Sequence, residues 1–150
     1  MVDQKKSKRQ QELNTALEAI YFGFRAITAR PDERLASLGL SRVHHRILYF
    51  IARNPGCSIN QLLSIMCVTK QYLHRPMQRL IEDKYVLVKP DPADKRIKRL
   101  HLSKKGEGLE NELSGDQRQQ FQQVFKEAGP QAESGWRKVM GLLAESSEER

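Results

Sequence analysis

Residues 69–80, TKQYLHRPMQRL, carry hydrogen-bonding side chains at a spacing that places them on one face of a helix. At 100° per residue, the apolar side chains fall together on one side: Leu73, Met77, Leu80 and Ile81. The opposite side collects the polar and aromatic side chains: Gln71, Tyr72, Arg75, Gln78 and Arg79. Arginine can form paired hydrogen bonds with the edge of a guanine, and glutamine with the edge of an adenine. A solvated helix face would have the same composition, so this chemistry needs support from the rest of the chain.

The backbone of this segment raises its own question. Thr69 can cap a helix, and the helix N-terminus beside Lys70 suits a phosphate. His74 of the same segment joins the candidate contacts. Pro76 removes one backbone hydrogen bond, at a cost of about 3 kcal/mol in a helix interior. Because the apolar spacing runs through Pro76 without a phase shift, we predict a continuous helix with a local kink.

A second polar group, Asp94-Lys95-Arg96, lies within PDPADKR, between the β-prone runs 85–88 and 97–102. In the second run, Leu100 and Leu102 alternate with polar residues, which indicates one buried face. We therefore predict a two-stranded hairpin with a long, exposed tip. The basic residues of the tip and its base are Lys95, Arg96, Lys98, Arg99, Lys104 and Lys105.

Positive charge is concentrated in the middle of the chain. Residues 41–106 carry 14 Lys and Arg against 4 Asp and Glu, whereas the remaining residues carry 12 against 14. A concentrated positive field attracts polyanions such as nucleic acid or an acidic membrane surface. A solvated lysine-rich surface is the alternative, so the charge gains meaning only from the elements that carry it.

The sequence lacks the signals that are typical of several classes of protein. Cys57 and Cys67 form no CxxC pair, and the four histidines add no zinc-ligand spacing, so we expect no metal and no cofactor. The sequence has no glycine-rich phosphate loop, nucleophile elbow or paired carboxylates, so we do not expect an enzyme. A run of about 18 apolar residues and a signal-peptide pattern are also absent. We expect a cytoplasmic protein without a membrane role.

The first of the elements that must position these side chains is a helix over about residues 7–29, which Pro31 is expected to end. Its apolar residues follow helical spacing: Leu13, Leu17, Ile20, Tyr21, Phe24 and Ile27. Together with Tyr21 and Phe24, Phe22 widens the apolar face beyond a single stripe. Either the core covers this face on two sides, or a partner does.

The remaining elements follow from caps and turn signals. Ser41 caps a second helix that stops at the turn Asn54-Pro55-Gly56, and Ser58 caps a short third helix. Residues 69–81 form the fourth helix, and the hairpin follows it. Two more helices, separated at Gly129-Pro130, complete a mainly α chain with a small β-hairpin. This order is that of a winged helix-turn-helix.

The element order and three short motifs resemble the MarR family of transcriptional regulators. The matching residues are Leu38-Gly39-Leu40-Ser41, then Ser58-Ile59, Leu62, Met66, Val68-Thr69-Lys70 and Leu80, then Asp94-Lys95-Arg96 and Leu102-Ser103-Lys104-Lys105-Gly106. The match covers roughly residues 38–109, and the flanking helices agree in position only. Cys67 stands where the family often has Gly, and Leu63 where it often has a small residue. The packing between these two helices is therefore expected to be adjusted.

The resemblance implies a homodimer that binds double-stranded DNA, most often as a repressor. On this basis, residues 1–40 form a dimerisation helix and loop, 41–106 the winged helix-turn-helix, and 107–150 the C-terminal dimerisation helices, within one compact domain. The apolar surplus at Tyr21-Phe22-Gly23-Phe24 and between residues 121 and 143 suits an interface between the two chains, although an ordinary core uses the same residues.

The resemblance also assigns roles to the two polar groups. Residues 69–81 become the recognition helix, with Gln71, Tyr72 and Arg75 toward the base edges of the major groove. Arg96 enters or borders the minor groove, oriented by an ion pair with Asp94. The expected DNA contacts are Thr69, Lys70, Gln71, Tyr72, His74, Arg75, Arg79, Lys95, Arg96 and Lys98. We assign Lys98, Arg99, Lys104 and Lys105 to phosphates or to no specific contact.

Two modes of regulation remain open. Family members commonly respond to small aromatic or phenolic effectors held between the dimer helices and the winged domain, which implies a pocket here at Tyr21, Phe24, His44, Tyr49 and Phe50. Aromatic residues at helical spacing are, however, more often core. Separately, Cys67 precedes the N-terminus of the recognition helix near Lys70, a setting that can lower a thiol pKa and support redox sensing.

The sequence thus predicts a sequence-specific regulator that binds double-stranded DNA. The main alternative is a winged-helix module that uses the same basic face to bind an acidic protein partner.

Overall fold

A computed structural model describes residues 2–148, with six helices and one two-stranded sheet in this range. In chain order the elements are α1 Val2–Ser37, α2 Arg42–Arg53, α3 Ile59–Met66, α4 Lys70–Glu82, β1 Val86–Pro90, β2 Lys98–Leu102, α5 Lys104–Ala128 and α6 Pro130–Glu148. The predicted class, mainly α with a small hairpin in a winged helix-turn-helix, is confirmed.

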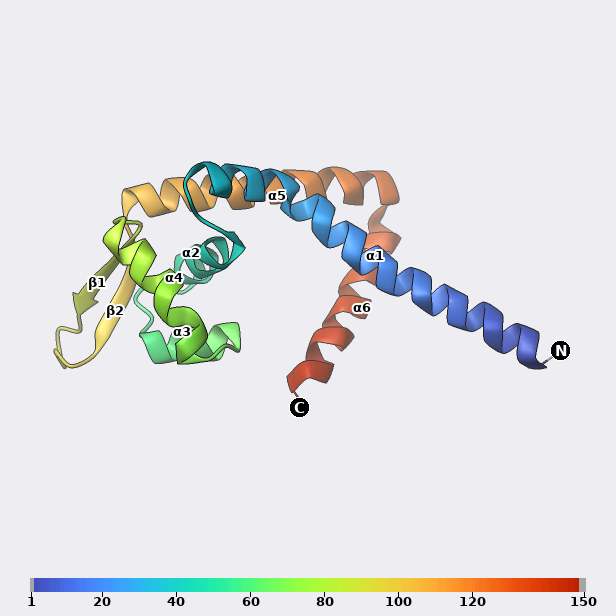
Figure 1. Cartoon of the computed structure of the whole chain (residues 1–150), viewed down its shortest axis with the longest axis horizontal. Helices are drawn as coiled ribbons and strands as arrows, with labels where there is room; N and C mark the ends of the chain where they lie inside the picture. The colour runs from blue at the N-terminus through green and yellow to red at the C-terminus, as the bar shows by residue number, and fades with distance from the viewer. Residues whose placement is uncertain (1, 149–150) are drawn as a thin grey trace.

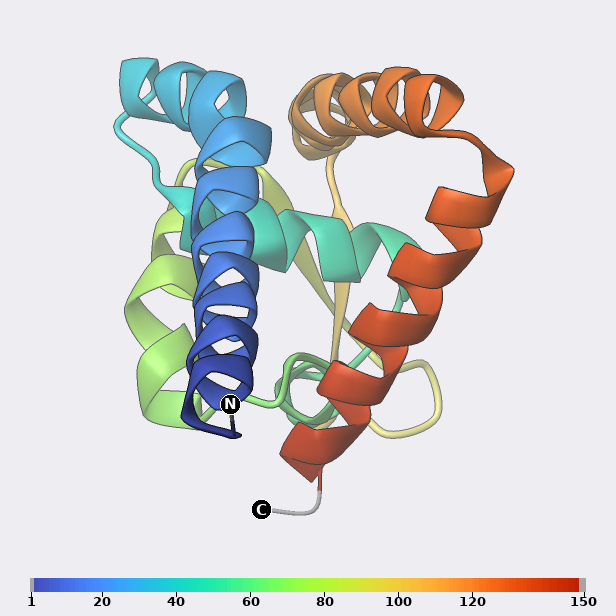
Figure 2. The same cartoon turned by 90° about the vertical axis from the view of Figure 1, so that its right-hand side faces the viewer.

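The molecule has a winged part and a projecting part. Helices α2, α3 and α4 and the hairpin form the winged part beneath the first half of α5 (Figure 1). Helices α1 and α6 extend away from the hairpin, and in a view turned by 90° both lie toward the viewer, α1 at the left and α6 at the right (Figure 2). The DNA-binding candidates therefore lie in one part, and two of the predicted dimerisation helices, α1 and α6, form the other.

A single hydrophobic core lies within the winged part and under α5. Its fully buried members come from every element except α6: Leu35, Ile47, Leu48, Ile51, Leu62, Leu73, Leu80, Val86, Leu100 and Leu113. Each such side chain contributes roughly 1.5–3 kcal/mol by leaving water. This core fixes α4 and the hairpin relative to each other.

Helix α1 is longer than predicted and passes through Pro31. The prediction that it runs over residues 7–29 is wrong, because the helix begins at Val2 and continues to Ser37. Proline cannot donate to the carbonyl four residues earlier, which is that of Ile27. The side-chain amide of Gln117 on α5 donates to this carbonyl instead, at 3.1 Å. After the proline, Leu35 is fully buried and holds the last turns of α1 against the core.

Local signals place α3 and α4 where the sequence predicts them. Ser58 and Gln61 form a capping box at the start of α3, with both hydrogen bonds present at 2.9 and 3.1 Å. The Thr69 hydroxyl accepts from the backbone N–H of Tyr72 at 3.2 Å and caps α4. Helix α4 continues through Pro76, as predicted, and the local kink stays a prediction.

The turn between α3 and α4 uses a left-handed residue. Cys67 has φ 55° and ψ 44°, a conformation that costs a residue with a Cβ roughly 1 kcal/mol or more relative to glycine. This geometry explains why glycine suits the position.

The hairpin is antiparallel, with Val86 opposite Leu102 and Pro90 opposite Lys98. Its strands lie one to two residues from the predicted runs. An additional β-bridge joins Cys57 to Leu100. Gly56 N–H donates to the Leu100 carbonyl at 2.8 Å, and Leu100 N–H donates to the Cys57 carbonyl at 2.9 Å. The segment before α3 therefore anchors the base of the wing.

Helix α5 begins where the wing signature ends. The hydroxyl of its cap, Ser103, accepts from Gly106 N–H at 3.0 Å and donates to the Lys84 carbonyl at 2.6 Å. A Cβ on Gly106 would lie only 2.1 Å from the Tyr85 carbonyl oxygen. Glycine is required here because the backbone of α5 passes directly against the Tyr85 carbonyl, in the segment between α4 and β1.

Candidate nucleic-acid interface

The outward face of α4 is held in place from behind. Leu73, Met77 and Leu80 are at most 4% exposed on the inner face. The predicted contact residues all lie exposed: Thr69, Lys70, Gln71, Tyr72, His74, Arg75 and Arg79. Burial on one side and exposure on the other leave this helix free to present its polar side chains to a groove.

The wing tip presents an oriented arginine. Arg96 donates through Nε to Asp94 Oδ1 at 3.0 Å and through Nη2 to Asp94 Oδ2 at 3.2 Å. Asp94 and Arg96 thus form an ion pair, as the family resemblance implies, and the structure shows that it has two hydrogen bonds. This ion pair, together with the backbone N–H of Arg96, holds the pKa of Asp94 below its ordinary value. The Arg96 side chain is still 91% exposed, so its orientation is set while its outer edge remains open.

Most of the expected cationic contacts are electrostatically uncompensated. Among residues 2–148, no carboxylate lies within 4.0 Å of Lys70, Arg75, Lys95 or Lys98. Free cations beside an exposed hydrogen-bonding face are suited to phosphates.

Arg79 differs from the other expected contacts. Its Nε lies 2.5 Å from Asp83 Oδ2, and its Nη2 donates to the Leu38 carbonyl at 3.4 Å. The guanidinium therefore ties α4 to the loop after α1. These protein partners distinguish Arg79 from Arg75, one turn earlier, which has no such ion pair.

Two of the basic residues assigned to phosphates or to no specific contact bind the protein itself. Arg99 pairs with Asp91, through Nε at 2.9 Å and Nη2 at 2.8 Å. Lys105 donates to the Asp83 carbonyl at 2.9 Å and lies 4.1 Å over the Tyr85 ring. Asp91, which the sequence analysis left without a role, organises the wing. The signal for it was its place directly after β1, two positions from Lys89, which lies opposite Arg99 in the hairpin.

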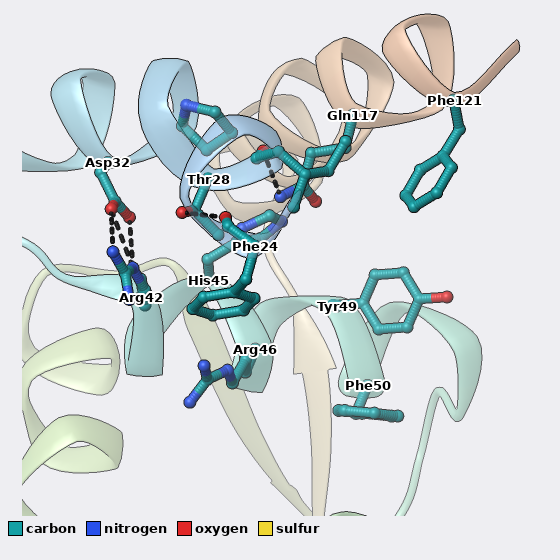
Figure 3. A pocket seen from close by; sticks show the side chains of 12 residues that line it. Phe24, Thr28, Asp32, Arg42, His45, Arg46, Tyr49, Phe50, Gln117 and Phe121 are labelled. Carbon is teal, nitrogen blue, oxygen red and sulfur yellow. Dashed lines mark hydrogen bonds and ion pairs between the residues drawn. The ribbon is translucent and has the colours of Figure 1, made fainter. Parts of the chain in front are cut away.

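A cavity of about 270 Å³ lies between α1, α2 and α5 (Figure 3). Its lining residues are Phe24, Ile27, Thr28, Pro31, Asp32, Arg42, His45, Arg46, Tyr49, Phe50, Gln117 and Phe121. Phe24, Tyr49 and Phe50, three of the five residues predicted for a pocket, come together here. Arg42 pairs with Asp32 at 2.8 Å and lies 4.9 Å over the Phe24 ring, whereas Arg46 is exposed.

The other two predicted pocket residues do not line this cavity. Tyr21 is exposed on α1, three residues before Phe24. The ring of His44 accepts from Ser41 N–H at 2.9 Å through Nδ1 and so belongs to the start of α2. His45 takes the place of His44 in the cavity, because only the later residue faces α5. The His45 ring lies 3.0 Å from the Ser114 hydroxyl, and burial lowers its pKa.

The two cysteines occupy different environments. Cys57 is buried at the base of the wing, where burial raises the pKa of its thiol. Cys67 is exposed at the turn before α4, and its Sγ lies 3.6 Å from the Ser64 carbonyl. The redox role of Cys67 stays a prediction. No group of three or more His, Cys, Asp or Glu among the described residues is arranged to hold a metal ion.

Large apolar side chains are exposed along the projecting helices. They are Leu13, Leu17, Ile20, Tyr21, Phe22 and Phe24 on α1, Val124 on α5, and Trp136, Val139, Leu142 and Leu143 on α6. A second cavity of about 460 Å³, lined largely by apolar side chains, lies among these three helices. Across the described residues, no helix is long and apolar enough to cross a membrane.

Comparison with known proteins agrees with this architecture. The model of the MarR family matches residues 38–97. The HTH-type transcriptional regulator PetP of Rhodobacter capsulatus is 39% identical over 140 residues, which cover 93% of this chain and 84% of PetP. The structure of Streptococcus pneumoniae FabT in complex with DNA is similar with a TM-score of 0.79 at 17% identity, over 93% of this chain and 98% of FabT. That of the transcriptional regulator SlyA has a TM-score of 0.75 at 19% identity, over 89% and 94%.

Proposed function

The chain belongs to the MarR family of transcriptional regulators, and from this premise we propose that it is a cytoplasmic repressor that binds DNA sequence-specifically. A homodimer would insert one α4 into the major groove of each half of a pseudo-palindromic operator. Arg96 of each wing would lie at the adjacent minor groove. Gln71, Tyr72 and Arg75 would meet base edges, and Lys70, Lys95 and Lys98 would meet phosphates.

One observation carries this proposal. The exposed face of α4 and the oriented arginine of the wing are fixed by a single core, and four cations near them have no carboxylate partner among the described residues: Lys70, Arg75, Lys95 and Lys98. Such an arrangement combines a base-reading surface with charges that phosphates can neutralise. FabT, whose solved structure is a complex with DNA, shares the fold.

The apolar side chains on the projecting helices support the proposed homodimer. Leu17 is 70% exposed and Val139 is 63% exposed, although each belongs to a run of apolar residues at helical spacing. Exposed apolar surface of this extent marks an interaction site. A second copy of the chain would bury these faces of α1 and α6 by twofold symmetry.

We also propose that a small aromatic acid or phenol releases the DNA. The cavity of about 270 Å³ is near the lower end of the usual size of ligand sites, which suits a one-ring ligand. Phe24, Tyr49 and Phe50 supply aromatic walls, and the exposed Arg46 can meet an anionic group. Salicylate, benzoate and phenol are suitable calorimetric probes, with Phe24→Ala as the variant expected to lose binding.

The test is binding to duplex DNA at several salt concentrations. Phosphate contacts predict a linear fall of log K with log salt, with a slope of roughly −0.9 for each phosphate neutralised. Arg75→Ala should weaken the selected duplex by at least about tenfold and relax the base preference at one position. Lys126→Ala removes the same charge from α5 and should change little. Equal affinity for selected and random duplexes would contradict the proposal and favour a protein partner.

A further inference from the structure

We propose that Arg99 is a positioning residue, which sets the wing tip, and with it Arg96, relative to the helix-turn-helix. The inference rests on the proposed DNA-binding function, because it concerns how the wing meets the groove. Arg99 is one of four basic residues in the hairpin segment KRIKR, but its guanidinium is directed to the protein. It acts through its neighbours and not as a DNA contact.

Arg99 lies at the junction of three segments. The adjacent Leu100 joins β2 to Cys57 through the backbone bridge before α3. From this anchored position the Arg99 side chain reaches Asp91 at the far end of β1, with two nitrogens at 2.9 and 2.8 Å from the same Oδ2. Only 30% of the Arg99 side chain and 15% of the Asp91 side chain are exposed. A charged pair of this geometry and partial burial is stronger than an isolated surface ion pair.

The third nitrogen of Arg99 faces the start of α3. Its Nη1 lies 3.4 Å from Gln61 Oε1 and 3.5 Å from the Gly56 carbonyl. The same Gln61 oxygen accepts from Ser58 N–H at 2.9 Å in the capping box of α3. Arg99 is therefore in contact with the helix-turn-helix on one side and with the wing on the other.

Asp91 passes this constraint on to the tip. Its Oδ1 accepts from the backbone N–H groups of Ala93 at 2.7 Å and Asp94 at 3.2 Å. Asp94 in turn accepts from the N–H, Nε and Nη2 of Arg96. The hydrogen bonds are continuous from Arg99 to Arg96, and each link fixes the next acceptor. The ion pair with Arg99 is also the largest cause of the lowered pKa of Asp91.

Arg99 has an electrostatic consequence as well. Without it, Asp91 would place an uncompensated negative charge directly after β1, in the same hairpin as the cations that would meet phosphates. Neutralisation by Arg99 removes this repulsion while Asp91 continues to hold the tip. Both effects favour a wing that is ordered before DNA binds.

The first test uses the free protein. Arg99→Gln should raise the amide hydrogen exchange of Ala93 and Asp94 by roughly tenfold, because the acceptor of both N–H groups loses its anchor. Lys89→Gln is the matched control, because Lys89 lies opposite Arg99 in the register of the hairpin and its substitution removes the same positive charge. Unchanged exchange of Ala93 and Asp94 in Arg99→Gln would overturn the proposal.

The second test is a double-mutant cycle with the selected duplex. Arg99→Gln should weaken binding by about tenfold, and adding it to Arg96→Ala should cost less than about twofold more, because the two act through one contact. Minor-groove protection should be lost, while major-groove protection by α4 remains. Additive losses with a smaller salt slope would make Arg99 a phosphate contact and overturn the proposal. Loss of protection in both grooves with a lowered melting temperature would overturn it in favour of a general structural role.

These two tests also separate this proposal from the DNA-binding function. If the wild-type protein selects no duplex, the proposed function fails. The exchange measurement still decides whether Arg99 holds the wing tip.

Discussion

The winged part and the projecting helices use the same apolar residue types in opposite ways. In the winged part, Leu62 and Leu80 are fully buried by neighbours from the same chain. On α1 and α6, Leu17 and Leu142 are 70% and 59% exposed. Helical amphipathicity is present in both regions, but only one of them contains the surface that its apolar face needs. The winged part is thus covered within one chain, and the exposed faces of the projecting part are those that the second copy of the proposed homodimer would cover.

The largest expected effect tests the completeness of the winged part. Gly106→Ala would place a Cβ 2.1 Å from the Tyr85 carbonyl oxygen, which is backbone and cannot move aside cheaply. We expect a loss of at least about 3 kcal/mol in the free energy of unfolding, measured by urea denaturation.

Gly108→Ala is the matched control, because nothing lies within 4 Å of the new Cβ in the same helix. It should stabilise α5 by roughly 0.5–1 kcal/mol. Equal stability of the two variants would show that α5 does not pack against the Tyr85 carbonyl as described.

The next prediction addresses the projecting part. Val139→Glu adds a charge to the exposed apolar face of α6 and should raise the dissociation constant of the dimer by roughly a hundredfold or more. Sedimentation velocity measures the change, and Lys138→Gln, at the neighbouring position, should leave the dimer intact. A monomeric wild-type protein, or an unaffected Val139→Glu dimer, would show that a second copy does not cover the apolar face of α6.

A third prediction concerns the joint between the regions. Gln117→Leu would leave the Ile27 carbonyl without its side-chain donor and should cost roughly 1–3 kcal/mol of unfolding free energy. Pro31→Ala restores a backbone N–H for this carbonyl, so the double variant should recover most of the loss. Independent, additive effects in denaturation would show that Gln117 does not compensate for Pro31.

A fourth prediction strengthens the winged part alone. Cys67→Gly should raise the unfolding free energy by roughly 1 kcal/mol, because glycine adopts the left-handed conformation without strain. Cys67→Ala retains the strain and should give no such gain. The dissociation constant of the dimer should be the same for both variants. A stabilised alanine variant would mean that the gain comes from loss of the thiol.

The smallest effect is a pH dependence at the joint of α2 and α5. Burial holds the pKa of His45 below its ordinary value of 6.5, with Glu110 acting in the opposite direction. The unfolded chain therefore takes up a proton more readily, and the free energy of unfolding should decrease as the pH falls from about 7 to about 5. His45→Gln should flatten this slope in part, since burial also lowers the pKa of His44. An unchanged slope would contradict the assignment.

The sequence was sufficient where the signals are local. The caps Ser58 and Thr69 and the turn at Asn54-Pro55-Gly56 act within a few residues, and α2, α3 and α4 begin and end where these signals predict. The apolar face of α4 also follows from spacing alone, which is why Pro76 did not mislead its assignment.

The features that the sequence analysis did not predict depend on contacts between residues far apart in the chain. Pro31 lies inside α1 because Gln117, 86 positions later in the sequence, donates to the Ile27 carbonyl, and no local pattern contains this contact. The difference between His44 and His45 is a rotation of 100° on α2, and only the packing of α5 decides which of the two faces the cavity. In sequence, Arg99 is similar to the other basic wing residues, and only the structure shows its pairing with Asp91.

The most direct test of the central claim is selection of binding sites from a random duplex pool, followed by footprinting and sedimentation of the complex. We expect a pseudo-palindrome with half-sites about one helical turn apart, protected in both grooves and bound by two copies of the chain. A selected site without twofold symmetry, one copy per site, or no selected sequence would contradict it.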